Sequence, residues 1–480
     1  MGTRKSIACK TKIVATIGPS SFGVRRLRQL FAAGVDGFRL NLSHGNLAQH
    51  AEVLGRIRQL SAETGRTAAV IIDLPGPKMR LGVLPEPVSV RRGERVYFCP
   101  GGETHSAPGL CLPHEIDDLA ERMRPGSTIF VSDGMLQFRV KARQGRVLET
   151  EALVAGVVRS NKGINLPGYK SPAGVLTPED QRGIAFAVEH GADVVCISFV
   201  GGPEDLLAAR ELLPESRHSR PCLLAKIERQ QAVANLDAIL AVADAVMVAR
   251  GDLGIELPIE EIPVRQKDII RRANMAAKPV IVATQMLLSM VDNARPTRAE
   301  VTDVANAILD GADAIMFSEE TAIGREPAAV VRIARKIARQ TERELVRSGS
   351  TAVAIRATIR TADSIDDLIS SATFDVLENR TVDLAVTPTA SGTTARRIAR
   401  LRPRPWIVAI TERPLVGNIL ALSFGVLPLL VASAVLSDSE LVAFLKQRGL
   451  IRPGQRVVIT AGSPFGVPGT TNSLKILDIC

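Results

Sequence analysis

The chain has 480 residues, too many for one ordinary hydrophobic core, so we expect about two to four domains. Hydrophobic residues make up 46% and charged residues 23% of it, a globular balance that leaves little room for long disorder. No apolar run approaches the roughly 18 residues that a membrane span needs, and the basic N-terminus lacks the apolar stretch of a secretory signal. We therefore expect a cytoplasmic protein with no membrane partner.

The net charge of +10 raises the question of nucleic acid binding. Aromatic residues are only 3% of the chain, and no basic block runs longer than a few residues. Proteins that bind single strands place aromatic stacking platforms beside their basic grooves. Anionic small substrates explain the excess of positive charge better, as does plain solubility, and we expect no nucleic acid partner.

Six cysteines are scattered along the chain without a CxxC pair, at positions 9, 99, 111, 196, 222 and 480. A disulfide framework is typical of small secreted domains, which this chain does not resemble. We predict that all six are reduced thiols.

Short apolar segments alternate with helix-like stretches through residues 1–76 and again through residues 171–344. The segments are β-branched or apolar almost throughout, as strands buried on both faces should be. One helix start is marked by Thr297, which lies at capping-box spacing from Glu300 and precedes an amphipathic run that ends near Asp310. Eight strands that alternate with helices predict an α/β protein built on a parallel (β/α)8 TIM barrel. The predicted strands are residues 12–18, 35–42, 68–74, 193–199, 221–227, 244–250, 279–285 and 313–318.

Residues 77–170 interrupt this barrel with a different pattern of short alternating strands. Turn signals at Arg92-Gly93 and Gln144-Gly145 are typical of an antiparallel β module. An insertion between a strand and its helix lies at the carboxyl-terminal rim of a barrel, where active sites lie. We therefore predict an inserted β-barrel-like lid domain. Residues 345–480 begin another α/β pattern and predict a C-terminal α/β domain with a small, mostly parallel sheet.

Polar residues interrupt the predicted barrel strands at their carboxyl ends. Arg39, Asn41 and Ser43 alternate at the end of the second strand, so the two-residue period of a strand puts them on one side. Any one such residue could be a charge that leaves a strand into solvent, or a cap on a helix dipole. Together they predict one active site at the mouth of the barrel. The others are Asp73, Lys226, Glu228, Asp252, Thr284, Ser318 and Glu320.

The residue types at this mouth favour phosphoryl transfer. Glu228 and Asp252 suit a hard divalent cation, Mg²⁺ or Mn²⁺, which takes a few carboxylates together with substrate oxygens. Lys226 and Arg39 supply the positive charge that a transferring phosphoryl group needs. The chain has no Walker-type GxxxxGK[ST] loop, so nucleotide binding must depend on other residues.

Eight segments of the chain resemble the pyruvate kinase family. They are KTKIVATIGPSS, FRLNLSHG, DLPGPKMR, NKGINLPG, AKIER, VMVARGDLGIE, VIVATQML and ARPTRAEVTDVANAILDGADAIMFSEETA, in the order and spacing of that family. The C-terminal third is similar chiefly through TASGTTAR and GTTN. The resemblance implies transfer of the phosphoryl group of phosphoenolpyruvate to ADP, giving pyruvate and ATP, the last step of glycolysis. It also implies a homotetramer and a phosphorylated allosteric effector.

The resemblance further implies roles for the residues at the barrel mouth. Lys226 stabilises the transferring phosphoryl group and the developing enolate oxygen, while Arg39 grips phosphate. Protonation of the enolate runs through water near Thr284 and Ser318, and no single general acid is assigned. The other implied contacts are Gly251, Asp252 and Thr284 to the substrate carboxylate, Glu228 and Asp252 to the metal, and His44, Arg80 and Lys162 to the nucleotide.

One charge substitution bears on the need for a monovalent cation. Many pyruvate kinases hold K⁺ with residues that match Asn41, Ser43, Asp73 and the carbonyl of Leu74. Those enzymes usually carry Glu where this chain has Lys78, in the run DLPGPK. This resembles the K⁺-independent branch, in which a tethered ammonium substitutes for the bound ion. We therefore expect that K⁺ is not required; the alternative is that Lys78 only covers a hinge surface.

Two further features stay open at the level of sequence. The family motif SGETA is SEETA here, so Glu319 adds a carboxylate beside the metal if it points inward and has no effect on the site if it points outward.

Small hydroxyls and a glycine at a helix start in the C-terminal domain form a phosphate cradle, or simply cap the helix. The resemblance implies an effector site there, completed by a loop across residues 461–472. The predicted effector residues are Thr389, Ser391, Gly392, Thr393 and Thr394.

Two other functions are alternatives to phosphoryl transfer. A barrel lysine such as Lys226 could form a Schiff base, as in a barrel lyase. The chain could also be a regulatory protein on an inactive kinase scaffold, which only Glu319 favours. The carboxylate pair Glu228 and Asp252 favours phosphoryl transfer over both.

Overall fold

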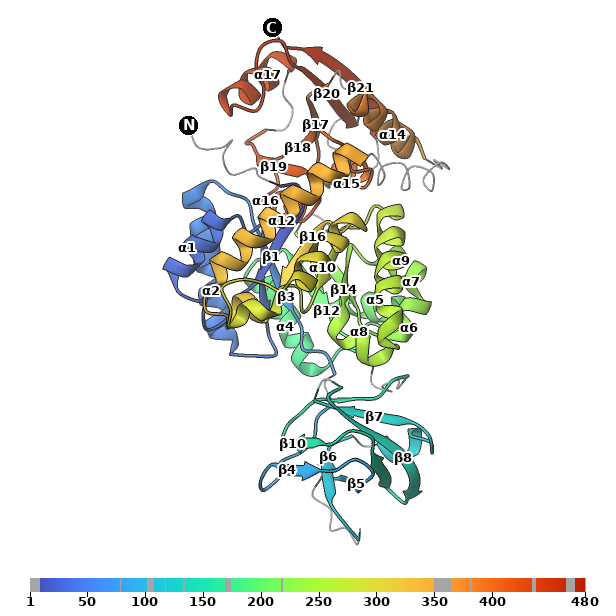
Figure 1. Ribbon diagram of the computed structural model, residues 1–480. Helices are drawn as coiled ribbons and strands as arrows, with labels where there is room; N and C mark the ends of the chain where they lie inside the picture. Colours follow the sequence, from blue (N-terminus) through green and yellow to red (C-terminus); the bar gives the residue numbers. More distant parts are fainter. Residues whose placement is uncertain are drawn as a thin grey trace.

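The structure is a computed structural model that describes residues 9–77, 79–101, 108–116, 118–132, 134–168, 174–216, 219–348, 364–379, 382–433, 437–462 and 471–479. Its elements form three groups, with a barrel between a β module and a C-terminal α/β unit (Figure 1). Lys78 lies outside the described residues. The domain boundaries predicted after residues 76, 170 and 344 stay predictions.

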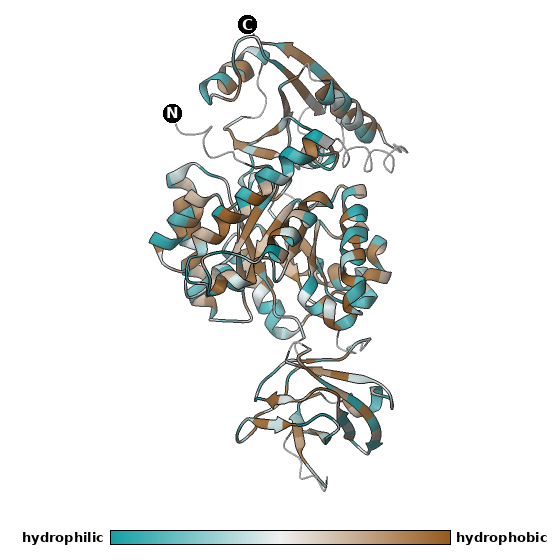
Figure 2. Ribbon diagram, in the orientation of Figure 1, coloured by the Kyte–Doolittle hydropathy of each residue, from teal (hydrophilic) through white to brown (hydrophobic). Residues whose placement is uncertain are grey.

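Eight parallel strands close into a barrel in the order β1-β16-β15-β14-β13-β12-β3-β2, which confirms the predicted TIM barrel. Each strand lies within the segment predicted for it. Their side chains are buried almost without exception, and the strands are coloured hydrophobic along most of their length in Figure 2. Burial on both faces explains the unbroken apolar runs in the sequence. The strands are β1 Lys12–Thr16, β2 Gly37–Asn41, β3 Ala69–Asp73, β12 Val194–Ile197, β13 Cys222–Ile227, β14 Ala245–Ala249, β15 Val280–Ala283 and β16 Ala314–Phe317.

Helices surround the barrel and begin where the sequence caps them. Thr297 and Glu300 form the predicted capping box at the start of α10, and Thr177 and Asp180 form a second one at the start of α4. The helices are α1 Val24–Ala33, α2 Leu47–Thr64, α4 Pro178–Glu189, α5 Pro203–Glu211, α6 Gln230–Ala234, α7 Leu236–Val242, α8 Arg250–Glu256, α9 Ile262–Met275, α10 Arg298–Leu309, α11 Glu319–Ala322 and α12 Pro327–Ser348, with 3-10 turns η1 Ile259–Glu261 and η2 Leu288–Val291.

The inserted β module begins after the carboxyl end of β3 and therefore lies at that rim of the barrel (Figure 1). Its main sheet has six strands in the order β11-β7-β8-β9-β5-β6, and β10 pairs with β4. The pairing is antiparallel as predicted, except that β5 and β6 run parallel. The elements are β4 Val88–Val90, β5 Arg95–Pro100, β6 Cys111–His114, α3 Leu119–Arg122, β7 Thr128–Val131, β8 Leu136–Gln144, β9 Val147–Ala152, β10 Gly156–Val158 and β11 Ile164–Asn165.

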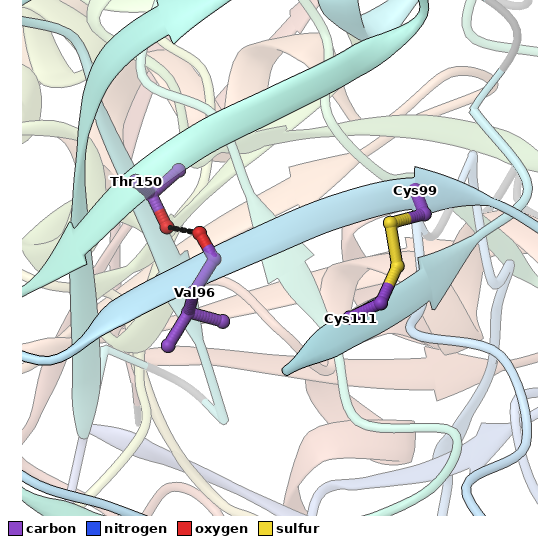
Figure 3. The surroundings of a disulfide bond; sticks show 4 residues. All are labelled: Val96, Cys99, Cys111 and Thr150. Atoms are coloured by element: carbon purple, nitrogen blue, oxygen red, sulfur yellow. Dashed lines mark hydrogen bonds between the residues drawn. A yellow bond between two sulfur atoms is a disulfide. The ribbon is translucent and has the colours of Figure 1, made fainter. Parts of the chain in front are cut away.

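The pairing of β5 with β6 brings two cysteines together. Cys99 and Cys111 form a disulfide, with their Cα atoms 6.1 Å apart (Figure 3). The prediction that all six cysteines are reduced thiols is wrong for this pair, because a strand as short as the four-residue β6 has no clear periodicity in the sequence to indicate its pairing with β5. Cys9, Cys196 and Cys222 are buried and reduced, as predicted.

The C-terminal unit packs against the end of the barrel opposite the β module (Figure 1). Its sheet has the order β19-β18-β17-β20-β21, and only the edge strand β21 is antiparallel, so the predicted small parallel sheet is confirmed. Lys12 in β1 donates a hydrogen bond of 2.6 Å to the carbonyl of Val426, and Asp313 accepts one of 2.9 Å from the N–H of Phe424. The elements are α14 Ile365–Glu378, β17 Leu384–Pro388, α15 Thr393–Ala399, β18 Trp406–Thr411, α16 Pro414–Leu420, β19 Val426–Leu430, α17 Asp438–Gln447, β20 Arg456–Gly462 and β21 Thr471–Asp478.

Within the ranges given above, no helix combines the length and the apolar character that crossing a bilayer requires.

Candidate active site

A cavity of about 430 Å³ opens at the carboxyl ends of the barrel strands and is closed on one side by residues of the β module. Three predicted residues are not part of its lining: Asp73 and Glu320 are each only 1% exposed, and the N–H of Gly251 is hydrogen-bonded to Oγ1 of Thr284. The other predicted residues of the barrel mouth all line this one cavity. They are Arg39, Asn41, Ser43, His44, Leu74, Arg80, Lys162, Lys226, Glu228, Asp252, Thr284 and Ser318.

Lys226 lies at the centre of a buried charge cluster. Its Nζ is 2.9 Å from Oε1 of Glu228 and 3.4 Å from Oδ1 of Asp73. Burial opposes the charged form of Lys226, but the carboxylates of Asp73 and Glu228 outweigh burial and raise its pKa above the ordinary value. The ammonium is therefore permanently charged at neutral pH. Lys226 and Glu228 share one side because they lie two residues apart at the end of β13.

Asp73 anchors the second cation of the cluster. Its Oδ2 accepts hydrogen bonds from the guanidinium of Arg39 at 2.6 Å, and Arg39 also donates one of 3.0 Å to Oγ1 of Thr16. Burial of Asp73 favours the neutral acid, but Lys226 and Arg39 outweigh burial and lower its pKa. Asp73 thus forms ion pairs with both cations, which line the cavity, but does not line the cavity itself.

The carboxylates that line the cavity fit a divalent metal. Oε2 of Glu228 accepts a hydrogen bond of 2.7 Å from the N–H of Phe199. Its Oε1 is buried, and no donor among the described residues is aligned to hydrogen-bond it, although Nζ of Lys226 is close. Asp252 lines the same cavity, and among the described residues no group of three or more His, Cys, Asp or Glu is arranged so that it could hold a metal ion by itself. Two carboxylates with room for substrate oxygens are the donor set that Mg²⁺ accepts.

Thr284 occupies a strained backbone conformation at the end of β15. Its φ of +70° lies in the left-handed region, which is uncommon for a β-branched residue. The Oγ1 of Thr284 accepts a hydrogen bond of 2.9 Å from the N–H of Gly251 and donates one of 2.6 Å to the carbonyl of Ala283. The N–H of Gly251 is therefore already engaged, and its predicted contact with a substrate carboxylate stays a prediction.

Of the two neighbouring glutamates that follow β16, one is buried and hydrogen-bonded and the other is exposed. Glu320 is 1% exposed and accepts hydrogen bonds from the N–H groups of Ser318 at 2.7 Å and Leu287 at 3.0 Å. Burial raises the pKa of Glu320 above its ordinary value, and the hydrogen bonds oppose that rise. Glu319 is exposed to solvent, and the described cavity wall does not include it. This arrangement favours the alternative in which the Glu319 side chain points outward and has no effect on the site.

The predicted nucleotide residues lie on two segments that run between barrel and β module. Arg80 donates a hydrogen bond of 2.9 Å to the carbonyl of Asn161, and the N–H of Leu81 donates one of 2.8 Å to the carbonyl of Lys162. Arg80, Lys162 and His44 all line the cavity.

Two residues that the sequence did not single out for the site are Ser198 and Phe199, which line the cavity after β12. Ser198 is a polar residue at the carboxyl end of an apolar strand, the same signal that identified Thr284 and Ser318. Its hydroxyl accepts a hydrogen bond of 2.8 Å from Nζ of Lys226. Positional reasoning alone could therefore have included Ser198.

The predicted effector turn lies in the C-terminal unit. Gly392 has a φ of +80°, and its N–H donates a hydrogen bond of 2.8 Å to Oγ1 of Thr389. The hydroxyls of Ser391 and Thr393 are 3.0 Å apart, within hydrogen-bonding distance. The middle of the late loop, residues 463–470, lies outside the described residues. Binding of a phosphorylated effector here stays a prediction.

Comparison with known proteins agrees with this geometry over the whole chain. The family model described as pyruvate kinase, barrel domain, matches residues 8–331, and that of the pyruvate kinase alpha/beta domain matches residues 367–477. A pyruvate kinase of Thermococcus litoralis is 40% identical over 478 residues, which cover 98% of each chain, and one of Agrobacterium vitis is 39% identical over 97% of this chain and 98% of its own. The crystal structure of a pyruvate kinase from Cryptosporidium parvum superposes with a TM-score of 0.91 at 31% identity, covering 100% of this chain and 98% of that one. The chain belongs to the pyruvate kinase family.

Proposed function

We propose that this protein transfers the phosphoryl group of phosphoenolpyruvate to ADP, giving pyruvate and ATP. The observation that supports this most directly is the meeting of Lys226, Glu228 and Asp252 in one cavity. That cavity is also lined by Arg80 and Lys162 from the segments beside the β module, where the second substrate would bind. A charged lysine beside two carboxylates suits positioning and charge neutralisation, which dominate phosphoryl transfer.

We assign the following roles to the chain's own groups. Lys226 places its permanent charge where the phosphoryl group and the enolate oxygen develop negative charge, and Arg39, held by Asp73, grips the phosphate. Thr284 and Ser318 order water that delivers a proton to the enolate. Glu228 and Asp252 would hold a divalent cation, Mg²⁺ or Mn²⁺, which would neutralise negative charge on the substrate.

The protonation state of Lys226 argues against the Schiff-base lyase. Only a neutral amine attacks a carbonyl, so a catalytic Schiff-base lysine needs a lowered pKa. Here Asp73 and Glu228 raise the pKa of Lys226. A regulatory protein without activity has no support from the site either, because Glu319 is exposed outside the described cavity wall.

We expect ATP formation from phosphoenolpyruvate and ADP to require a divalent cation, as a coupled assay with and without EDTA would show. Glu228→Gln should raise the Mg²⁺ concentration for half-maximal rate by about 10-fold or more, because one of two carboxylate ligands is lost. Glu319→Gln is the matched control and should leave that concentration unchanged, since its carboxylate is exposed. ATP formation at full rate in EDTA would contradict the metal site.

We propose further that K⁺ is not required. Asp73, the one charged member of the predicted monovalent site, already has two cationic partners, Arg39 and Lys226. Activity in Na⁺ or Tris buffers should stay within about twofold of that in K⁺, whereas Lys78→Glu should create a K⁺ requirement. Initial rates in buffers that differ only in the monovalent cation measure this. Activation of the unaltered protein by K⁺ of about 10-fold or more would refute the proposal.

The cytoplasmic location, the homotetramer and the phosphorylated effector stay predictions from the family resemblance.

A further inference from the structure

The turn that follows β12 contacts both Lys226 and Glu228. Ser198 bonds to the lysine through its hydroxyl, and Phe199 bonds to the glutamate through its backbone N–H. We propose that Ser198 and Phe199 form a positioning turn that holds Lys226 and Glu228 at the separation which phosphoryl transfer and metal binding require. This inference rests on the proposed function for its catalytic consequence, but its consequence for metal binding does not depend on that function.

The hydroxyl of Ser198 has a fixed orientation. It donates its one hydrogen to the carbonyl of Leu74 at 2.7 Å and accepts a hydrogen bond of 2.8 Å from Nζ of Lys226. The side chain is only 2% exposed, so water cannot replace either bond at low cost. Because the hydrogen is committed to Leu74, a lone pair must face the ammonium. Ser198 thus gives Nζ a neutral acceptor that competes with its carboxylate partners.

That competition matters for Glu228. Nζ of Lys226 already lies 2.9 Å from Oε1 of Glu228, the carboxylate oxygen that is not hydrogen-bonded within the described structure. Without Ser198, the N–H of Lys226 that now donates to Ser198 would be free to turn toward Oε1 of Glu228, to which the ammonium is attracted. The same oxygen would then be less able to bind a metal, and the charge of Lys226 would be withdrawn from the phosphoryl group.

Phe199 holds the other oxygen of the same carboxylate. Its N–H donates to Oε2 at 2.7 Å, which fixes the plane of the Glu228 carboxylate and leaves Oε1 toward the lysine. This requires a φ of +57° at Phe199, a conformation that L-residues adopt only at some energetic cost. Strain of this kind persists where surrounding structure enforces it, and it concentrates at functional sites.

The surrounding structure does enforce the turn. A Cβ atom at Gly76 would lie 2.8 Å from Cβ of Ser198 and 2.9 Å from the ring of Phe199, so only glycine permits the observed packing. Gly76 is itself held by a hydrogen bond of 2.9 Å from its N–H to the carboxylate of Asp180. The guanidinium of Arg229 also lies over the ring of Phe199, 5.6 Å from its centre.

The test compares Ser198→Ala with a matched hydroxyl deletion outside the site. Thr150→Val is that control, because Thr150 is buried and donates to the carbonyl of Val96 at 2.7 Å, as Ser198 does to Leu74, but lies in β9 of the β module (Figure 3). We expect Ser198→Ala to lower kcat about 10- to 100-fold and to weaken Mn²⁺ binding by about 10-fold, as losses of groups that orient metal ligands do. Thr150→Val should change neither quantity.

Mn²⁺ binding is measured with the metal alone, from the loss of the free-ion EPR signal, so it requires no turnover. Ser198→Cys keeps a weaker donor and acceptor and should fall between wild type and Ser198→Ala in both measurements. In a Lys226→Arg background, Ser198→Ala should cost less than about threefold in kcat, because a residue that acts through Lys226 is non-additive with its loss.

Two outcomes would overturn the proposal. One is unchanged Mn²⁺ affinity in Ser198→Ala, and the other is the same kcat loss in the Lys226→Arg background as in wild type. A wild-type protein that forms no ATP would refute the proposed function instead, and the Mn²⁺ measurement would still decide the role of the turn.

Discussion

Lys226→Met is expected to lower kcat for ATP formation by about 1,000-fold or more, because it removes the permanent charge beside the transferring group. The raised pKa of Lys226 means that wild type presents this charge at every pH near neutrality. A methionine is unbranched and only one heavy atom shorter than lysine, but it leaves the charges of Glu228 and Asp73 without their shared partner. The measurement is kcat in the coupled assay, with the thermal midpoint recorded to confirm folding.

Two further variants separate chemistry from stability. Lys226→Arg keeps a positive charge in a different shape, so it should fold like wild type and retain more activity than Lys226→Met. Lys278→Met removes a partly buried lysine at the opposite end of the barrel, where Nζ donates to the carbonyl of Ala243 at 2.6 Å. That variant should lose stability and keep its kcat. Wild-type kcat in folded Lys226→Met would show that the protein is not a kinase of this mechanism.

The sequence could predict the barrel because its signals are local. Each strand is a run of buried apolar residues, and the capping box of Thr297 and Glu300 marks the start of α10. The site residues followed from the same signals, since a polar residue that ends a buried strand must lie at the rim of the barrel. Asn41 and Ser43, for example, lie in the cavity wall as the two-residue period requires.

What escaped prediction depends on contacts between distant parts of the chain. The role of Ser198 needs the carbonyl of Leu74, 124 positions away, and the ammonium of Lys226, 28 positions away. No spacing in the sequence predicts that these residues are in contact. The disulfide is a related case, because Cys99 and Cys111 meet only through the parallel pairing of two short strands. Periodicity is too weak to identify a strand as short as β6.

Asp73→Asn is expected to lower stability by about 3–5 kcal/mol at neutral pH, because it leaves two buried cations without their shared carboxylate. Asp73 is 1% exposed and lies 2.6 Å from the guanidinium of Arg39 and 3.4 Å from Nζ of Lys226. An amide can accept a hydrogen bond from Arg39 but carries no charge to balance either cation. Because both cations are predicted to contact the phosphoryl group, kcat should also fall, by about 10-fold or more.

The pH dependence of this loss has a defined sign. The folded-state pKa of Asp73 is lowered, since Lys226 and Arg39 outweigh the effect of burial, so its stabilisation is complete above the unfolded-state value of 3.8. The difference in thermal midpoint between wild type and Asp73→Asn should therefore be largest near neutrality. It should shrink as the pH falls below about 4 and through the lower folded-state pKa.

Asp193→Asn provides a control for which the expected pH dependence of stability has the opposite sign. Asp193 is also buried, at 2% exposure, but burial outweighs its bond to Arg58 and raises its pKa. The contribution of Asp193 to stability should therefore increase as the pH falls through its raised folded-state pKa, which is the reverse of Asp73. Thermal midpoints of the three proteins from pH 7 down to about pH 3.5 would measure both trends. If the two variants lost their differences from wild type in parallel, general acid unfolding would explain the result, and the ion pairs of Asp73 would not carry the stability assigned to them.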